Sequence, residues 1–120
     1  FEEGTFGIWA YNIETVLAEK VETILRRGEL NTRPRDFYDV YILAKTQHYE
    51  HKIFIDALKS TAMHRDTTHI FTNIRSRLDE ISGSDTLRSR WNKYTKDYRY
   101  AAGIPYGDVM DTIRGLVQTL

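Results

Sequence analysis

The sequence contains no cysteine, which excludes disulfide frameworks, thiolate catalysis and zinc sites built on cysteine. It also lacks any apolar run near the roughly 20 residues that a membrane-spanning helix needs. Residues 1–7 are acidic rather than basic, with no apolar segment of a secretory signal behind them. We therefore expect a cytoplasmic protein with no membrane partner.

An excess of charge of one sign is absent as well. The 17 lysines and arginines equal the 17 aspartates and glutamates in number. This balance argues against a dedicated nucleic-acid-binding domain held by bulk electrostatics, although it does not exclude a local basic face.

What the sequence does contain is a series of helical stripes, in which apolar side chains recur three and four residues apart. The pattern predicts a mainly α protein, a helical bundle of about five to six helices. The segment at residues 35–47 is apolar almost all round. We expect it to be the central helix, because such a helix is buried on most sides.

One segment does not fit the helical pattern. Residues 6–11 are rich in aromatic and β-favouring side chains and predict a short strand. No partner strand is evident, and an orphan strand leaves its backbone hydrogen bonds unmade. We expect residues 1–12 to be the last strand of a truncated core and residues 13–120 to be a C-terminal helical domain. Copies of the chain could then self-associate through the exposed strand.

Charged side chains break the apolar pattern at three positions. Lys20 lies on the stripe of the first helix, three residues after Leu17 and four before Ile24. Asp36 and Asp39 lie one turn apart on the otherwise apolar second helix. Two carboxylates and a lysine that converge from neighbouring helices would suit phosphate and metal chemistry.

Each of these residues also has a purely structural interpretation. Lys20 could bury its stem and extend its ammonium group into water. Asp36 could be an acidic residue favoured by the dipole of a helix first turn, an explanation that fits Asp39 less well. The nearest partners for the two carboxylates are Arg33, Arg35 and Lys20.

A basic stretch interleaved with aromatic residues spans positions 75–99. It predicts either a nucleic-acid face or a solvated basic side of a helix whose aromatic residues face the core, and we favour the second. The candidate nucleic-acid contacts are Arg88, Arg90, Lys93 and Lys96. The histidines show no metal-ligand spacing, so no metal site is expected.

Two blocks of sequence resemble a known family. They are residues 10–20, Ala-Tyr-Asn-Ile-Glu-Thr-Val-Leu-Ala-Glu-Lys, and residues 31–41, Asn-Thr-Arg-Pro-Arg-Asp-Phe-Tyr-Asp-Val-Tyr. Together they are similar to the nucleotidyltransferase toxins of the AbiEii/AbiGii abortive-infection type. In that family a helix with an Ala-Glu-Lys core precedes a helix that opens with Arg-Asp. Residues 91–94 and 100–101 also look like the C-terminal helical region of these toxins.

The resemblance implies a nucleotidyltransferase core followed by a helical domain, in a toxin–antitoxin system used for phage defence. Lys20 would be the catalytic motif lysine and Asp36 the motif aspartate, with Arg35 and Asp39 in support. The full-length parent would transfer nucleotides from an NTP, with Mg²⁺, to an acceptor such as tRNA. Its antitoxin would act mainly on expression or on the RNA target rather than by tight binding.

The chain departs from the family pattern in one respect. It has no Asp-x-Asp pair for metal binding, and its one Gly-Ser segment, Gly83-Ser84, lies after the lysine block, out of order. We therefore expect a fragment that is inactive by itself and needs neither Mg²⁺ nor NTP. The alternatives are a non-catalytic helical protein-interaction module and, third, a helical domain that binds nucleic acid without catalysis.

Overall fold

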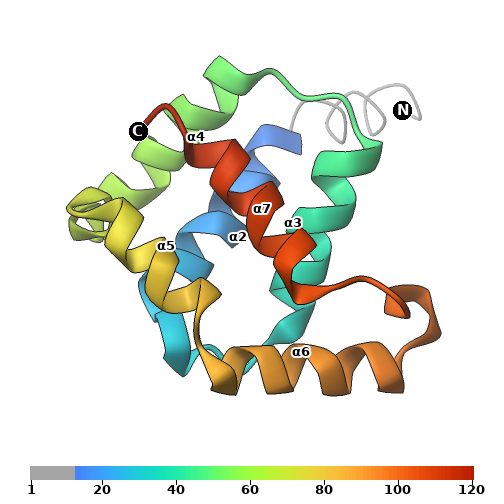
Figure 1. Ribbon diagram of the computed structural model, residues 1–120. Helices are drawn as coiled ribbons and strands as arrows, with labels where there is room; N and C mark the ends of the chain where they lie inside the picture. The colour runs from blue at the N-terminus through green and yellow to red at the C-terminus, as the bar shows by residue number, and fades with distance from the viewer. Residues whose placement is uncertain (1–12) are drawn as a thin grey trace.

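The computed structural model describes residues 13–120, which form a bundle of six α-helices (Figure 1). The helices are α2 (Ile13–Arg27), α3 (Pro34–Thr46), α4 (His51–His64), α5 (Ile74–Ser82), α6 (Asp85–Asp97) and α7 (Tyr106–Val117). Three short 3₁₀ turns connect them: η1 (Gly28–Leu30), η2 (Thr68–Phe71) and η3 (Arg99–Ala101). The predicted helical bundle is confirmed. The predicted strand at residues 6–11, and self-association through it, lie outside the described residues.

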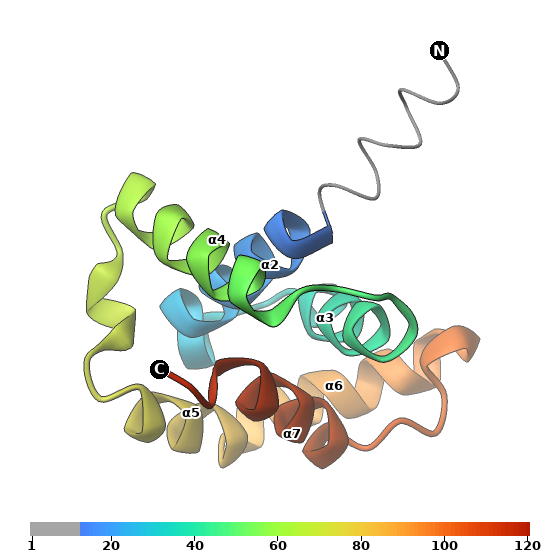
Figure 2. The same cartoon turned by 90° about the horizontal axis from the view of Figure 1, so that it is seen from above.

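The helices pack in two layers (Figure 2). One layer holds α2, α3 and α4, and the other holds α5, α6 and α7, with the apolar core between them. Across residues 13–120, no helix combines the length and the apolar character that a membrane crossing requires.

The central helix is α2, which packs against both α3 and α4. Its apolar stripe is fully buried, with no exposed surface on Leu17, Ala18, Val21, Ile24 and Leu25. The prediction that residues 35–47 form the central helix was wrong. Helix α3 packs one face against α2 and α7. The rest of its apolar side chains stay half-buried at the outside of the layer.

A tight connection fixes where α3 begins relative to α2. Helix α2 ends at Arg27, and the next residue, Gly28, has a φ of 53°, the left-handed conformation typical of the residue after a helix C-terminus. The buried Asn31 side chain accepts a hydrogen bond from the Arg33 backbone N–H at 2.6 Å. Pro34 occupies the first turn of α3, where its missing N–H does no harm. The first turns of α3 therefore lie beside α2.

The second layer follows the predicted stripes with two changes. The stripe at residues 70–81 is divided, because Asn73 adopts a left-handed conformation with φ 55° and α5 starts only after it. Helix α6 ends at Asp97, so Tyr98 leaves the buried face and is 46% exposed. Trp91, one turn before Tyr94, stays buried and donates from its indole Nε1–H to the Ile104 carbonyl at 2.8 Å.

Candidate functional site

The Lys20 ammonium group lies between two carboxylates of α3. Its Nζ is 3.0 Å from Asp39 Oδ2 and 3.7 Å from Asp36 Oδ1. The Lys20 side chain is 27% exposed, that of Asp39 19% and that of Asp36 6%. The three predicted residues are thus brought together at a half-open surface of the α2–α3 pair, and the tighter partner of Lys20 is Asp39.

Two arginines from the start of α3 flank the carboxylates on the solvent side. Arg35 Nε donates to Asp39 Oδ1 at 3.1 Å, and Arg33 Nε is 3.9 Å from Asp36 Oδ2. The hydrogen bond and the charge of Asp39 raise the pKa of Arg35 above its ordinary value. We refer to Lys20, Asp36, Asp39, Arg33 and Arg35 as the Lys20 cluster.

The Lys20 cluster suits an anion better than a metal ion. It sets two carboxylates against three cations, and both arginine side chains are more than half exposed. Within residues 13–120 there is no group of three or more acidic, histidine or cysteine side chains that could hold a metal ion. An incoming phosphate could therefore take up cationic partners that the two aspartates now share.

The four predicted nucleic-acid contacts on α6 differ in how they are used. Arg90 donates to the Asn31 carbonyl at 2.8 Å, and Arg88 donates to the Ser82 carbonyl at 3.3 Å and covers the Tyr106 ring. These two arginines hold elements of the fold together. Lys93 pairs with Asp97 at 2.8 Å on the exposed side, and this pairing raises the pKa of Lys93. Lys96 is exposed and makes no ion pair within residues 13–120.

The structure adds a tyrosine cluster, which sequence patterns had assigned to the core. It comprises Tyr38 from α3, Tyr94 from α6, and Tyr98 and Tyr100 from the turn after α6. The Tyr38 and Tyr100 rings are 4.9 Å apart, and those of Tyr94 and Tyr98 are 4.8 Å apart. The hydroxyls of Tyr94 and Tyr100 are hydrogen-bonded at 2.6 Å. Burial and this hydrogen bond raise the pKa of Tyr94, which therefore stays neutral.

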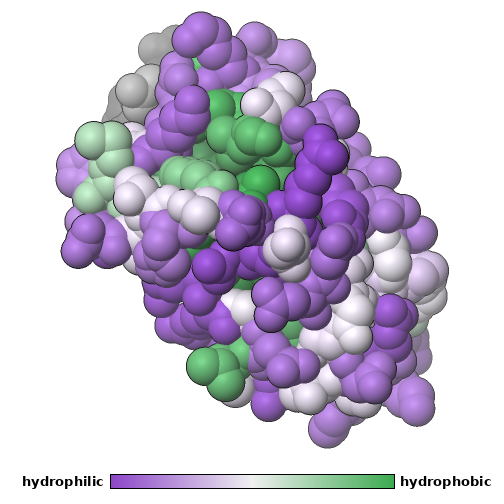
Figure 3. All heavy atoms as spheres, turned by 60° about the vertical axis from the view of Figure 1, so that its left-hand side comes forward, coloured by the Kyte–Doolittle hydropathy of each residue, from purple (hydrophilic) through white to green (hydrophobic). Residues whose placement is uncertain are grey.

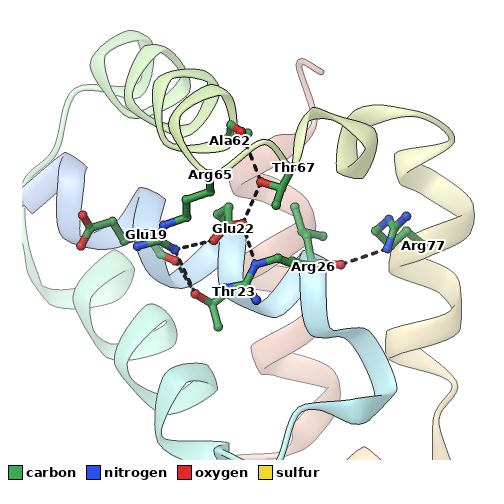
Figure 4. Close-up of polar contacts among 9 residues, drawn as sticks. Glu19, Glu22, Thr23, Arg26, Ala62, Arg65, Thr67 and Arg77 are labelled. Atoms are coloured by element: carbon green, nitrogen blue, oxygen red, sulfur yellow. Dashed lines mark hydrogen bonds and ion pairs between the residues drawn. The ribbon is translucent and has the colours of Figure 1, made fainter.

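A second charged group on α2 escaped the sequence analysis. The Glu22 carboxylate has no exposed surface and accepts hydrogen bonds from Arg26 and Thr67, both at 2.9 Å, and from Arg65 (Figure 4). Burial by itself raises the pKa of Glu22, but these hydrogen bonds outweigh it and the pKa lies below its ordinary value. The signal that identified Lys20 could also have identified Glu22, because Glu22 is a charged residue on the buried stripe between Ala18 and Leu25.

A groove lies elsewhere on the described part of the chain, between α5 and α7. It measures about 540 Å³, and its apolar side chains come from Ile74, Leu78, Val117 and Leu120. Figure 3, which brings the side of α5 forward, shows apolar side chains gathered in a hollow among hydrophilic ones. No residue of α2 or α3 lines this groove, so it is separate from the Lys20 cluster.

The fold and the site together define a helical domain with a half-open cluster of one lysine, two aspartates and two arginines. A family model described as nucleotidyl transferase AbiEii toxin, type IV TA system, matches residues 1–111. The chain therefore belongs to this family of nucleotidyltransferase-like toxins. Membership of a toxin–antitoxin system implies an antitoxin partner and a nucleotide substrate. No curated protein and no solved structure matches the chain.

Proposed function

We propose that this chain contributes the phosphate-binding half of a nucleotidyltransferase site. In this proposal Lys20 binds the triphosphate of an NTP and neutralises the charge that develops as the nucleotidyl group leaves pyrophosphate. Asp36 and Asp39 hold the Lys20 side chain in place before the nucleotide binds. The two flanking arginines, Arg33 and Arg35, are within reach of the same phosphates.

The observation that carries the proposal is the position of the Lys20 ammonium group. A lysine that only covers apolar surface would extend into water, whereas Lys20 Nζ lies within 3.0 Å of one α3 carboxylate and 3.7 Å of another. It keeps 27% of its side-chain surface accessible. A fixed and accessible cation is what a phosphate site requires, because the cost of orienting it has been met before the ligand arrives.

The metal ion of the reaction does not fit the described residues. Nucleotidyl transfer uses Mg²⁺ held by carboxylates, but Asp36 and Asp39 each face cations, and no third acidic ligand lies beside them within residues 13–120. We therefore assign Mg²⁺ to a nucleotidyltransferase core with an Asp-x-Asp pair, and give the present chain the lysine and its positioning carboxylates. The acceptor in this proposal is an RNA, such as tRNA.

The test is nucleotide transfer by the full-length protein. The assay follows labelled nucleotide from each NTP into an RNA pool with Mg²⁺ present. It compares the unsubstituted full-length protein with its Lys20→Ala and Asp36→Asn variants. We expect Lys20→Ala to reduce transfer by about 100-fold or more, the usual effect of removing one preorganised group at developing charge. Asp36→Asn should reduce transfer less, because Asp39 still holds the lysine.

Lys59→Ala is the matched control, since Lys59 is an exposed lysine of α4 that forms no ion pair within residues 13–120. It should transfer nucleotides as the parent protein does. Thermal unfolding of all three variants separates lost chemistry from lost folding. Full transfer activity in a folded Lys20→Ala protein would overturn the proposal.

A further inference from the structure

Two neighbouring aromatic side chains are exposed beside the Lys20 cluster. Five large hydrophobic residues are exposed within residues 13–120. Three of them lie away from the turn after α6: Leu30 is in η1, and Ile53 and Met63 are near opposite ends of α4. The other two, Tyr98 at 46% and Tyr100 at 50%, lie next to each other, with ring centroids 5.5 Å apart. Exposed apolar side chains that are gathered in one patch, rather than scattered singly, are typical of a site that contacts a partner.

The exposed rings are held by buried ones. Tyr94 is 8% exposed and contacts both Tyr98 and Tyr100, and Trp91 stacks on Tyr94 at 5.6 Å with an interplanar angle of 28°. Tyr38 of α3 braces Tyr100 edge-on. Because the rings are already ordered, a ligand that stacks on them loses little additional side-chain entropy.

The tyrosine cluster and the Lys20 cluster meet on α3, which carries members of both, and we refer to the two together as one surface. Tyr38 and Asp39 are consecutive in α3, and Asp39 contacts Lys20 on one side and Arg35 on the other. Burial and the Tyr100 hydrogen bond raise the pKa of Tyr94, and the charge of Arg35 lowers it by a smaller amount, so Arg35 lies within electrostatic reach of Tyr94. In both views of the ribbon, the C-terminal end of α6 lies next to α3 (Figures 1 and 2).

This surface is basic although the chain as a whole is neutral. Residues 33–39 and 93–100 together hold five lysines and arginines against three aspartates, and Lys20 adds a sixth cation. Arg99 and Lys96 are exposed and make no ion pair or hydrogen bond through their side chains within residues 13–120. Aromatic faces combined with free cations are the two components of a site for single-stranded nucleic acid.

We propose that Tyr98 and Tyr100 form a stacking platform for an unpaired nucleobase of a nucleic-acid acceptor strand, beside the Lys20 cluster. The bases of an unpaired strand expose their faces, which stack on tyrosine rings, while Lys96 and Arg99 contact the backbone phosphates. The inference deepens the proposed function, on which it rests for the role of the bound strand. An acceptor end held on the platform would lie next to the lysine assigned to the NTP.

Binding of a labelled RNA hairpin to the 120-residue chain tests the platform without any need for catalysis. One hairpin ends in an unpaired 3′ overhang and the other is blunt, and fluorescence anisotropy gives their affinities. Tyr98→Leu keeps an apolar side chain but removes the ring, so the overhang hairpin should bind about tenfold more weakly. Tyr98→Phe keeps the ring and should bind as the parent chain does.

Met63→Ala is the control, because Met63 is a 70% exposed hydrophobic residue on α4, outside the platform. It should leave binding unchanged. Equal affinity for blunt and overhang hairpins, or equal affinity of Tyr98→Leu and the parent chain, would overturn the inference. Binding of a free NTP that depends on Tyr98 in the same way, with no preference for the overhang, would also overturn it, since the base would then belong to the nucleotide.

The two proposals fail in different ways. If Lys20→Ala keeps full transfer activity but Tyr98→Leu loses RNA binding, the platform stands and the assignment of the lysine is wrong. If Lys20→Ala loses transfer but Tyr98→Leu binds RNA normally, the lysine assignment stands and the platform is wrong.

Discussion

Helix α2 carries two charged clusters that differ in almost every physical respect. Glu22 lies at 0% exposure between α2, the end of α4 and the turn before η2, and its carboxylate is bound by three side chains. Lys20, two residues earlier, lies at the α2–α3 boundary with 27% of its side chain exposed. The first cluster is closed to solvent at its charged centre, whereas the second is open.

The difference separates two uses of a charge on an apolar stripe. A buried carboxylate with all its hydrogen bonds made within the protein can hold helices together but has no capacity left for a ligand. The Lys20 side chain keeps 27% of its surface exposed and the side chains of Arg33 and Arg35 are exposed, so a phosphate can reach all three. Closure thus indicates a structural role and openness a binding role, and the following predictions test that contrast.

The largest expected effect comes from removing one cation of the closed cluster. Arg65→Met should lower the free energy of unfolding by about 3 kcal/mol, because the buried Glu22 carboxylate loses a partner and cannot turn to water. Arg26 and Thr67 remain bound to the carboxylate, which keeps the loss at the lower end of the range for buried pairs. Urea unfolding monitored by circular dichroism gives the value.

The matched control for that variant is Arg75→Met. Arg75 is exposed on α5 and makes no ion pair within the described part of the chain. Its replacement should change the free energy of unfolding by less than about 0.5 kcal/mol. Equal losses in the two variants would show that Arg65 stabilises the fold no more than an ordinary surface arginine does. The closed cluster would then have no structural role to set against the open one.

A smaller effect concerns the pH dependence of stability. Because the pKa of Glu22 is lower in the folded chain than its ordinary value of 4.5, the folded state binds this proton less tightly than the unfolded state. The stabilisation is therefore complete above pH 4.5 and is lost as the pH falls through the folded-state pKa. Glu22→Gln removes the titrating group, so the stability difference between parent and variant should shrink over that acid range. A difference that stays constant there would contradict the assignment.

Sequence reasoning reached the open cluster more readily than the closed one. Lys20, Asp36 and Asp39 stood out because charges on apolar stripes are costly, and the family motifs named the same positions. Glu22 carried the same signal but has no motif to mark it. Its partners Arg65 and Thr67 follow α4 about 45 residues later, and only tertiary packing brings them to α2.

The helical bundle was predictable because apolar periodicity directly reflects burial. Which helix lies at the centre of the bundle was not predictable in this way. The apolar character of residues 35–47 indicated a central helix, whereas the helix at the centre is α2, with a narrower stripe. Aromatic residues misled in the same way. Tyr98 continues the stripe of Trp91 and Tyr94 in sequence, but α6 ends at Asp97 and turns the last tyrosine outward.

The smallest expected effect, and the one that decides the contrast, is the stability of the open cluster. Lys20→Met, Asp39→Asn and the double variant form a cycle whose coupling energy should be about 1 kcal/mol or less, because water reaches both side chains and Arg35 remains beside Asp39. Urea unfolding of the four proteins gives the coupling. A value as large as the loss in Arg65→Met would mean that Lys20 holds α2 and α3 together as Glu22 holds α2 and α4. Reduced activity of Lys20 variants could then be ascribed to folding, and openness would no longer indicate a binding role.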